Sequence, residues 1–528
     1  MLKTVYSTSG MMVAPHHLAA QAGRDVLAEG GNAIEAMVSA AATIAAVYPH
    51  MNSIGGDGFW LIKKPGQEPI AIDASGPAAA GATLDYYAGH ESIPQRGPLA
   101  ALTTAGTISG WQEALKVSAE IGGRLPLTRL LSPAISHARN GIVVTESQAR
   151  LTAEKLSQLK DVPGFQDHFM SNGMLPDVGS LMRQSKLADT LERLSKAGLD
   201  DFYRGEIAAA IGDEFARLGS PLRSSDLNAY QADQVAALSV KLQGSTVYNL
   251  PPPTQGLASL MILGIVDKLG LKSVDDFEYM HTLIEATKRA FRVRDRVVTD
   301  PGRVPQNPMD FLKTDVLKQL SEEIDPSTAL PWPDPAQPGD TIWMGCIDNE
   351  GVAVSFIQSI YWEFGSGVVL QDTGINWQNR GISFSLTPSD LQVLEPGRKP
   401  FHTLNPAMAA FEDGRVMTYG TMGGEGQPQT QAAVFSRYAM CHRPLQEAIT
   451  SARWLLGRTW GDETTTLKLE NRFSPALVNQ LQEAGHVVEV LDEAFSDTMG
   501  HAGAIVKRPD GVYEGAADPR SDGAVAAL

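Results

Sequence analysis

A pair of strands near the middle of the chain constrains the fold more than any other segment. Residues 341–348 and 352–360 are both rich in Ile, Val and aromatic side chains, and Asn349-Glu350-Gly351 between them is typical of a tight turn. The pattern predicts a β-hairpin. If the turn is centred on Glu350, Thr341 lies opposite Ser359, with the two side chains about 5 Å apart. A one-residue shift in register would undo this pairing, and two hydroxyl residues on a sheet can also be purely structural.

Helices and strands follow one another in mixed order along the rest of the chain, which indicates an α/β or α+β fold. Helical patterns cover residues 14–48, with a break at Gly30-Gly31-Asn32, and residues 111–160, 186–225, 257–269, 277–297, 429–441 and 474–484. Strand patterns cover residues 247–250, 364–370 and 415–421. No repeat at a solenoid period is present in the sequence.

Residues 325–339 differ in composition from the segments on either side. They are rich in proline and polar residues, with five prolines between residues 326 and 338. Such a stretch is typical of an exposed or extended linker and not of a core element. The linker ends directly before Thr341, so it separates the first part of the chain from the predicted hairpin.

Charge and hydrophobicity argue against two classes of partner. The 528-residue chain has 43 Lys and Arg against 60 Asp and Glu, a net charge of −17. An acidic chain of this kind lacks the positive surface that attracts nucleic acid or an anionic membrane. The longest mostly apolar run, residues 36–48, is shorter than the about 20 residues of a membrane span. We therefore expect no nucleic-acid partner and no membrane association.

The chain also lacks the usual signs of secretion and of metal binding. Its first residues include no continuous apolar segment of a secretory signal. Two cysteines, Cys346 and Cys441, are too few for a disulfide framework or a metal cluster, although one bridge stays open. The adjacent His16 and His17 cannot share the i,i+4 geometry of two ligands on a helix. We expect a reduced, cytoplasmic protein without a metal or another cofactor.

A second candidate site follows the predicted strand at 415–421. Gly423-Gly424 leads from this strand into a helical pattern that begins near Pro428, a residue suited to a first helical turn. A strand–glycine–helix junction leaves several backbone N–H groups pointing together, and these can hold an anion or an oxyanion. An ordinary tight turn is the alternative interpretation, because two adjacent glycines carry little information.

Taken together, these segments resemble the γ-glutamyltranspeptidase family of N-terminal nucleophile hydrolases. The resemblance covers nearly the whole chain in order, and its combined specificity is high although each motif alone is weak. The motifs that carry it are Gly30-Gly31-Asn32-Ala33, Ile54-Gly55-Gly56-Asp57-Gly58-Phe59, His281 with Glu285, Asp295-Arg296, Asp340-Thr341, Phe364-Gly365-Ser366-Gly367, Thr373-Gly374-Ile375, Gln378-Asn379-Arg380-Gly381, Gly423-Gly424 and Ala517-Asp518-Pro519-Arg520.

The resemblance implies a four-layer αββα fold of the α+β class, made as a precursor that cuts its own Asp340–Thr341 bond. Residues 1–340 would form the large chain and residues 341–528 the small chain, together one αββα unit. Thr341 would be the nucleophile, and its freed α-amine, with an ordinary pKa of about 7.7–8.0, the general base. Gly423 and Gly424 would supply the oxyanion hole, and Ser359 stands where the family has a second Thr that assists the nucleophile.

Two departures from the family pattern bear on the substrate. Ser75 stands where the transpeptidases have the Arg that binds the glutamate α-carboxylate, and Ser383 where they have the Asp that binds its α-amino group. Losing one partner of a buried ion pair costs roughly 2–5 kcal/mol. The sequence therefore argues against γ-glutamyl specificity and against glutathione as the main substrate.

The predicted substrate-binding residues are Tyr361, Asn379, Arg380, His402 and Thr403. Arg380 offers a planar fork suited to a carboxylate, although it could equally form a structural ion pair. His402, which with Thr403 replaces the paired serines of the family, could contact substrate or satisfy a hydrogen bond in the core. The aromatic side chains around these positions suggest a small, crowded pocket, although some of them belong to the core.

The motifs look most similar to the branch of the family that contains oxamate amidohydrolases and relatives of the class IV cephalosporin acylases. The resemblance thus implies hydrolysis of a small carboxylate-bearing amide, with oxamate preferred. The alternatives are a γ-glutamyl or glutaryl amide hydrolase or acyltransferase, and an uncleaved relative without catalytic activity. The expected partner is the chain's own second fragment, in a heterodimer that could itself dimerise.

Overall fold

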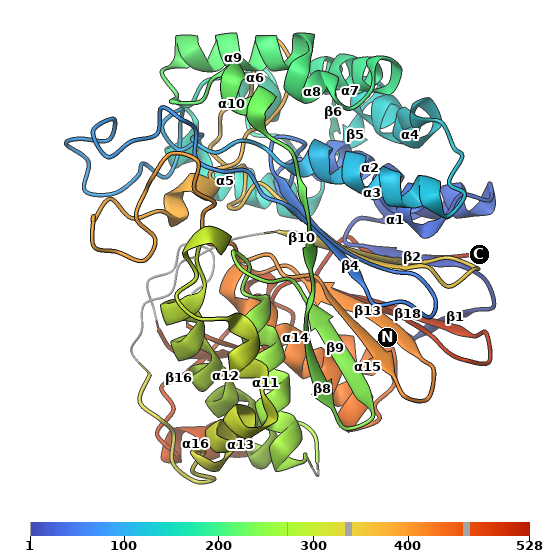
Figure 1. Ribbon diagram of the computed structural model, residues 1–528, viewed down its shortest axis with the longest axis vertical. Helices are drawn as coiled ribbons and strands as arrows, with labels where there is room; N and C mark the ends of the chain where they lie inside the picture. The colour runs from blue at the N-terminus through green and yellow to red at the C-terminus, as the bar shows by residue number, and fades with distance from the viewer. Residues whose placement is uncertain (1, 272, 333–340, 458–464) are drawn as a thin grey trace.

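Two seven-stranded sheets face each other, and helices cover the outer face of each sheet (Figure 1). This computed structural model describes residues 2–271, 273–332, 341–457 and 465–528. The layers follow the order helix, sheet, sheet, helix, so the predicted αββα architecture of the α+β class is confirmed. The predicted junction at Asp340 lies outside the described residues, and the division into residues 1–340 and 341–528 stays a prediction.

Every neighbouring pair of strands within the two large sheets is antiparallel. The upper sheet of Figure 1 has the order β19 (Ala524–Ala527), β2 (Met11–Ala14), β10 (Ile342–Ile347), β11 (Ala353–Ser359), β3 (Asp57–Lys63), β4 (Ile70–Ala74) and β7 (Asp233–Ala236). The lower sheet has the order β1 (Val5–Ser7), β18 (Tyr513–Ala517), β17 (Ala502–Lys507), β13 (Val416–Thr421), β12 (Ala407–Phe411), β9 (Ser245–Asn249) and β8 (Leu238–Leu242).

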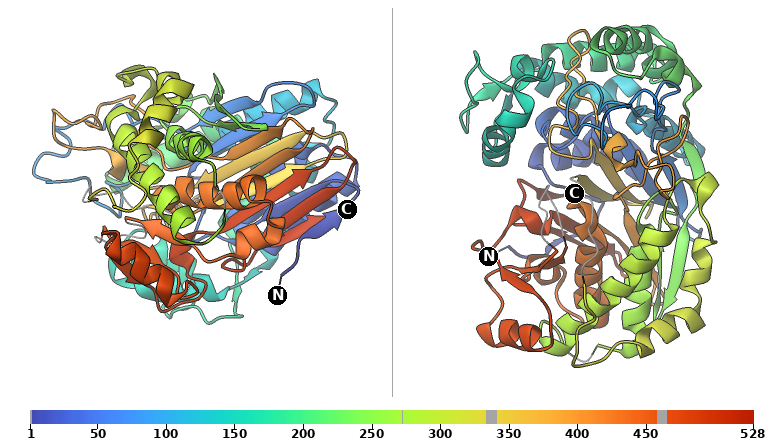
Figure 2. Two further views of the ribbon diagram at one scale, coloured as in Figure 1. Left: turned by 90° about the horizontal axis from the view of Figure 1, so that it is seen from below. Right: turned by 90° about the vertical axis from the view of Figure 1, so that its left-hand side faces the viewer.

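Two small sheets lie outside this sandwich. One pairs β5 (Ile142–Val143) with β6 (Leu181–Met182), and the other joins β14 (Trp454–Leu456), β15 (Leu467–Leu469) and β16 (Val488–Val490). The two ends of the chain lie on the same side of the sandwich (Figure 2), where β1 and β19 are edge strands and the Ser7 hydroxyl donates to the carbonyl of Leu528.

The helices divide into two groups, one for each outer layer (Figures 1 and 2). The upper layer holds α1 (His17–Ala28), α2 (Ala33–Val47), α3 (Thr107–Glu120), α4 (Leu127–Asn140), α5 (Glu146–Leu159), α6 (Phe165–Phe169), α7 (Ser185–Ala197), α8 (Asp201–Arg204), α9 (Glu206–Leu218) and α10 (Ser224–Ala229). The lower layer holds α11 (Gly256–Leu269), α12 (Phe277–Val297), α13 (Thr314–Glu322), α14 (Gln427–Phe435), α15 (Leu445–Thr450) and α16 (Pro475–Glu483).

The helix α2 shows how local sequence sets these elements. Its predicted separation from α1 is confirmed, because Asn32 caps α2 and forms a reciprocal capping box with Glu35. All fifteen residues of α2 are buried, in keeping with its many alanines, which let it pack closely on the upper sheet. Within the described residues, none of the helices is both long enough and apolar enough to cross a membrane.

One predicted strand is wrong, and one predicted helix differs from the prediction in its start and in the type of its last turn. Residues 364–370 form turns and not a strand, because Phe364, Gly365 and Gly367 have φ angles of 62°, 57° and 77°, outside the region that a strand needs. The helix predicted at 429–441 begins at Gln427 and changes at Ser436 into a π-helical turn that ends at Met440. Of the predicted linker, residues 325–332 contain neither helix nor strand, and the rest falls outside the described residues.

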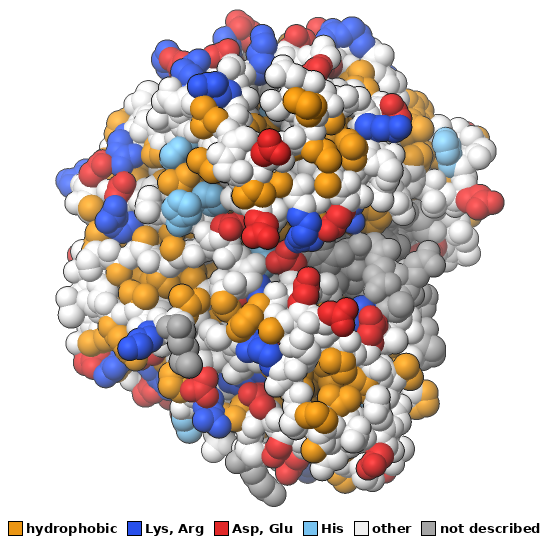
Figure 3. All heavy atoms as spheres, turned by 180° about the vertical axis from the view of Figure 1, so that it is seen from behind, with side chains coloured by type: hydrophobic (Ala, Val, Ile, Leu, Met, Phe, Trp, Pro, Cys, Tyr) orange, Lys and Arg blue, Asp and Glu red, His pale blue; other side chains and the backbone are white. Residues whose placement is uncertain are grey.

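Acidic, basic and apolar side chains are interspersed over the face of the molecule seen in Figure 3. No large field of one charge covers that view.

The predicted hairpin has the predicted register. Ile342 pairs with Gln358 and Ile347 with Ala353, which places Thr341 beside Ser359. All residues of β10 and β11 are buried, because helices cover one face of their sheet and the lower sheet covers the other. The nucleophile candidate therefore lies at the end of a central hairpin, held on both faces.

The indole of Trp343 fills the space between the two sheets. A Cβ added at Gly420 of β13 would lie 2.2 Å from Trp343 Cδ1, and one at Gly503 of β17 would lie 2.5 Å from Trp343 Cζ3. Only glycine fits at these two positions while the ring stays in place. The indole Nε1–H donates to the Ser355 hydroxyl across the hairpin at 3.0 Å.

This packing also positions Thr341. Side chains two apart on a strand point to the same face, so Thr341 and Trp343 both point toward the lower sheet. Trp343 packs on Gly420, and a Cβ at Gly345 would lie 2.9 Å from Thr418 Oγ1. The same alignment, continued by two residues, predicts that Thr341 lies opposite Met422, directly before Gly423.

The packing of Trp343 predicts that Gly503→Ala destabilises the protein by about 1–3 kcal/mol through overpacking. In a Trp343→Phe background the same substitution should cost about 1 kcal/mol less, because phenylalanine lacks the ring atoms that approach Gly503. The prediction is tested by measuring the free energies of unfolding of the wild type, the two single variants and the double variant. Equal costs in the two backgrounds would show that Trp343 does not set the space at Gly503.

Candidate active site

Thr341 and Ser359 meet at the end of the central hairpin. Both side chains are buried, and the Thr341 hydroxyl donates to Ser359 Oγ at 3.3 Å. Ser359 Oγ also accepts the backbone N–H of Tyr361 at 2.8 Å. The loop before β3 approaches closely here, because a Cβ at Gly56 would lie 2.0 Å from the carbonyl oxygen of Ser359. The structure thus brings together the two hydroxyl residues that the sequence paired.

The turn after Ser359 carries Tyr361 in an unusual backbone conformation. Tyr361 has a φ of 82°, which is uncommon for a residue with a side chain and costs of order 1–3 kcal/mol. The turn is held by Asn379, whose Oδ1 accepts the N–H of Trp362 at 3.2 Å and whose Nδ2 donates to the carbonyl of Gln95 at 3.1 Å. Asn379 was predicted to bind substrate, but both ends of its amide contact backbone groups and hold this turn.

Arg380 lies beside Tyr361 and is fully buried. Its Cζ is 3.6 Å from the centroid of the Tyr361 ring, a cation–π arrangement, and its Nη1 donates to Thr403 Oγ1 at 3.3 Å. Its Nε and Nη2 have no hydrogen-bond partner among the described residues. Burial lowers the pKa of Arg380 to about 10, so the guanidinium stays charged at neutral pH. A buried fork with two unpaired N–H directions is suited to a carboxylate.

A second buried pair lies next to this cation. His402 Nε2 is 2.9 Å from Asp57 Oδ2, and both side chains are fully buried. Asp57 Oδ1 accepts the N–H groups of Gly76 and Gly106 and the side-chain amide of Gln378. Burial raises the pKa of Asp57 to about 7, although the neighbouring hydrogen bonds and Arg380 oppose that change.

Burial, reinforced by the charge of Arg380, holds the pKa of the His402 ring well below its usual value. His402 is therefore neutral, and its Nδ1 has no partner among the described residues. One of its nitrogens satisfies a core hydrogen bond, which was one of the two predicted roles. Asp57 was not predicted as a site residue, although it lies in the glycine-rich motif at 54–58 that supported the resemblance.

Hydroxyl groups occupy the two positions where the resemblance implies charged clamps. The Ser75 hydroxyl is buried and donates to Asp73, whose other oxygen pairs with Lys399 at 2.8 Å. The Ser383 hydroxyl is buried without a hydrogen-bond partner among the described residues. Neither serine can supply the charge that a glutamyl group needs. In the part of the chain that the structure describes, no three His, Cys, Asp or Glu side chains lie close enough together to hold a metal ion.

The glycine turn follows directly from β13. Gly423 and Gly424 have φ angles of 112° and 51°, a conformation that favours glycine, and a single turn of 3₁₀ helix, Gly424–Gly426, leads into α14. The Met422 carbonyl accepts the Thr421 hydroxyl at 2.7 Å, and the Gly423 carbonyl accepts the N–H of Gly426 at 2.8 Å.

These carbonyl contacts fix the direction of two N–H groups. The C=O and N–H of a trans peptide point in opposite directions, so the N–H groups of Gly423 and Gly424 point away from the hydrogen bonds that hold the turn. The first N–H groups of a helix have no partner inside it. Two adjacent N–H groups turned in this way form an arrangement suited to an oxyanion.

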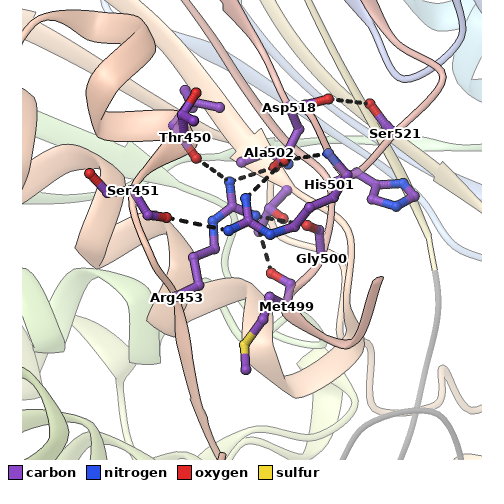
Figure 4. Close-up of polar contacts among 12 residues, drawn as sticks. Thr450, Ser451, Arg453, Met499, Gly500, His501, Ala502, Asp518 and Ser521 are labelled. Carbon is purple, nitrogen blue, oxygen red and sulfur yellow. Dashed lines mark hydrogen bonds and ion pairs between the residues drawn. The ribbon is translucent and has the colours of Figure 1, made fainter. Parts of the chain in front are cut away.

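A buried arginine supports the outer side of this turn. Gly423 packs against Gly500, since a Cβ at Gly423 would lie 3.3 Å from Gly500 Cα. The Arg453 guanidinium donates to the carbonyls of Met499 and Gly500 and pairs with Asp518 (Figure 4). Burial alone would raise the pKa of Asp518, but Arg453 and Arg520 outweigh it and lower that pKa to about 2. The segment behind the glycine turn is therefore held by a charged network.

The chain resembles known proteins over its full length. The family model described as gamma-glutamyltranspeptidase matches residues 19–528. The oxamate amidohydrolase proenzyme of Klebsiella pneumoniae is 57% identical over 521 residues, 98% of each chain. The glutathione hydrolase-like YwrD proenzyme of Bacillus subtilis is 39% identical over 531 residues, 100% of each chain.

Solved structures agree with these sequence relatives. The crystal structure of cephalosporin acylase from Bacillus halodurans superposes with a TM-score of 0.92 at 32% identity, covering 100% of this chain and 97% of that one. These matches cover nearly the whole chain and therefore span both sheets and both helical layers. The chain therefore belongs to the γ-glutamyltranspeptidase family.

Proposed function

We propose that this chain is a self-processing amidohydrolase that converts oxamate to oxalate and ammonia, with Thr341 as its nucleophile. The observation that carries the proposal is the fully buried Arg380, which keeps two N–H directions unpaired among the described residues and is linked through Tyr361 to Ser359 and Thr341. The 57% identity to an oxamate amidohydrolase proenzyme supports the same substrate.

Self-processing would begin with the Thr341 hydroxyl. Its oxygen attacks the carbonyl carbon of Asp340, the C–N bond between residues 340 and 341 breaks, and an ester forms in its place. Water then hydrolyses the ester, which leaves a carboxylate on Asp340 and a free α-amine on Thr341. An α-amine with a pKa of about 7.7–8.0 can exchange protons near neutral pH. One residue then supplies both the nucleophile and the base.

Oxamate hydrolysis uses the same atoms. The oxamate carboxylate pairs with Nε and Nη2 of Arg380, which directs the adjacent amide carbon toward Thr341. The α-amine takes the hydroxyl proton as the oxygen attacks, and the N–H groups of Gly423 and Gly424 bind the resulting oxyanion. The C–N bond breaks, and ammonia leaves with a proton from the ammonium group of Thr341. Water, activated by the same amine, hydrolyses the oxalyl ester and releases oxalate.

The substrate preference follows from charge. Ser75 and Ser383 provide no charges for a glutamyl group, whereas Arg380 provides one cation for one carboxylate. Hydrolysis or transfer of γ-glutamyl or glutaryl groups is the alternative function within the family. We further propose that fragments 1–340 and 341–528 remain together as a heterodimer in the cytoplasm, which could itself dimerise. The proenzyme names of two relatives support the cleavage.

The nucleophile assignment predicts that wild-type protein runs as two fragments on a denaturing gel and releases ammonia from oxamate. Thr341→Ala should stay uncut and inactive, because it lacks the attacking oxygen. Thr152→Ala is the matched control, since Thr152 is also a buried threonine but donates to a helix carbonyl in α5. Cleavage of the Thr341→Ala chain at residue 340 would exclude Thr341 as the nucleophile.

The carboxylate fork predicts that Arg380→Met lowers kcat/KM for oxamate at least about 30-fold, the loss expected when a buried charge pair is broken. Arg380→Lys should fall between this variant and the wild type, because an ammonium keeps the charge without the planar fork. Steady-state kinetics on cleaved protein measure both. Arg398→Lys is the control, because Arg398 is a buried arginine that contacts backbone carbonyls. An unchanged kcat/KM in Arg380→Met would show that Arg380 does not bind the substrate carboxylate.

The Asp57 carboxyl predicts a pH effect on substrate binding. Its pKa is raised to about 7, so it is neutral below that pH and negative above it. The negative form would compete with the substrate carboxylate for Arg380. The KM for oxamate should therefore rise as the pH increases through about 7, and Asp57→Asn, which cannot ionise, should lose that rise. The same KM profile in both proteins would assign the titration to another group.

A further inference from the structure

Gln255 connects the glycine turn to the residue that partners Arg380. Its side-chain Nε2 donates to the carbonyl of Gly424 at 2.8 Å and to the carbonyl of Thr403 at 2.7 Å. Gln255 is fully buried and precedes the first residue of α11. One amide nitrogen therefore holds two backbone segments of the candidate site that lie 21 residues apart in the sequence.

Arg294 fixes the orientation of that amide. Its Nη1 donates to Gln255 Oε1 at 3.1 Å, and its Nη2 donates to Glu425 Oε2 at 2.7 Å. Arginine is a donor only, so the Gln255 oxygen must face it and the Gln255 nitrogen must face the two carbonyls. Arg294 is also buried, and it reaches the turn from α12, which packs beside α11 and α14 (Figure 1).

The two carbonyls do not depend on Gln255 to the same degree. The Thr403 carbonyl also accepts Asn405 Nδ2 at 3.0 Å, from within its own segment. The Gly424 carbonyl has a second donor in the N–H of Gln427, but that bond closes the turn on itself. Gln255 and Arg294 thus hold the part of the turn at Gly424 and Glu425 from outside its own segment, while Gly500 packs against Gly423. Their loss would loosen the turn at Gly424 and leave the Arg380 side of the site in place.

We propose that Gln255, oriented by Arg294, is the positioning residue that aims the oxyanion-binding N–H groups of Gly423 and Gly424 at Thr341. The inference rests on the proposed function, because it assigns a reaction to this turn. Gln255 touches neither the nucleophile nor the predicted carboxylate fork. Its effect should therefore appear in the transition state, where the oxyanion forms, and not in substrate binding.

Gln255→Glu is the sharpest test, because it is nearly isosteric and keeps an acceptor for Arg294 while removing both donated hydrogen bonds. In cleaved protein, kcat for amide hydrolysis should fall about 10- to 100-fold, as expected for a small displacement of catalytic groups. The KM should stay within about threefold of the wild-type value, because Arg380 is undisturbed. Arg294→Lys should give a smaller loss of kcat, since a single ammonium nitrogen keeps the charge but does not reproduce the two separate nitrogen positions from which Arg294 contacts Gln255 and Glu425.

Gln184→Glu provides the matched control. Gln184 is also a buried glutamine whose Nε2 donates to a backbone carbonyl, that of Ala46, but it lies in the upper helical layer before α7. Thermal midpoints of all variants separate lost stability from lost kcat. If Gln255→Glu stays uncut, Arg294→Lys supplies the measurement.

The outcomes separate the two proposals. Ammonia release from oxamate by the wild type tests the proposed substrate. If the wild type releases no ammonia from oxamate, the variants are assayed on the glutaryl or γ-glutamyl amide that the wild type hydrolyses. A wild-type kcat in cleaved Gln255→Glu overturns the positioning role. The positioning role is also overturned if Gln184→Glu loses as much kcat as Gln255→Glu does, or if Gln255→Glu raises KM without changing kcat.

Discussion

The packing of Trp343 between the two sheets is the interaction on which the rest of the site depends. The ring occupies space that only glycine at positions 420 and 503 leaves open. Thr341 directly precedes β10, and its side chain points to the same face as Trp343, so the packing that fills the core also positions Thr341, the proposed nucleophile. A substitution that disturbs this packing should therefore change both the stability of the core and the position of Thr341, because protein interiors are close-packed and transmit displacement.

The polar groups around this core form a continuous series from the hydroxyl of Thr341 to the glycine turn. Ser359, Tyr361, Arg380, Thr403 and Gln255 follow one another by contacts that have been described. Within this series Arg380 is the member whose guanidinium keeps unpaired N–H groups among the described residues. A buried charge that is incompletely paired costs several kcal/mol, and a bound carboxylate would remove that cost. The groups proposed to bind the substrate are thus already held in place by contacts within the protein.

Local patterns predicted the parts of the structure that local interactions determine. The hairpin register followed from the turn at Glu350, and the break between α1 and α2 followed from Asn32, which caps the second helix. The strand expected at 364–370 failed because its apolar residues alternate with glycines in left-handed conformations, which an apolar pattern does not reveal.

Asp57 and Gln255 escaped prediction because each acts through a long-range pair. Asp57 contacts His402, which is 345 positions away, and Gln255 contacts Gly424, which is 169 positions away, so neither pair leaves a local signal. The place of Asn379 beside Arg380 suggested substrate contact; the structure shows that its amide contacts two backbone groups, and the substrate contact stays a prediction. Motif position indicated which residues cluster, and the structure adds the hydrogen bonds that each of them makes.

The order of strands in the sheets has a consequence for a chain that is cut before Thr341. In the upper sheet β2 and β3, from the first part of the chain, flank β10 and β11 from the second part, and β19 lies beyond β2. In the lower sheet β1 and β9 flank the strands β12, β13, β17 and β18. The two fragments are therefore interleaved through both sheets, and pulling them apart would require breaking backbone ladders in each. Cleavage would change the number of covalent chains without creating a subunit interface in the usual sense, so dissociation and unfolding would be the same event.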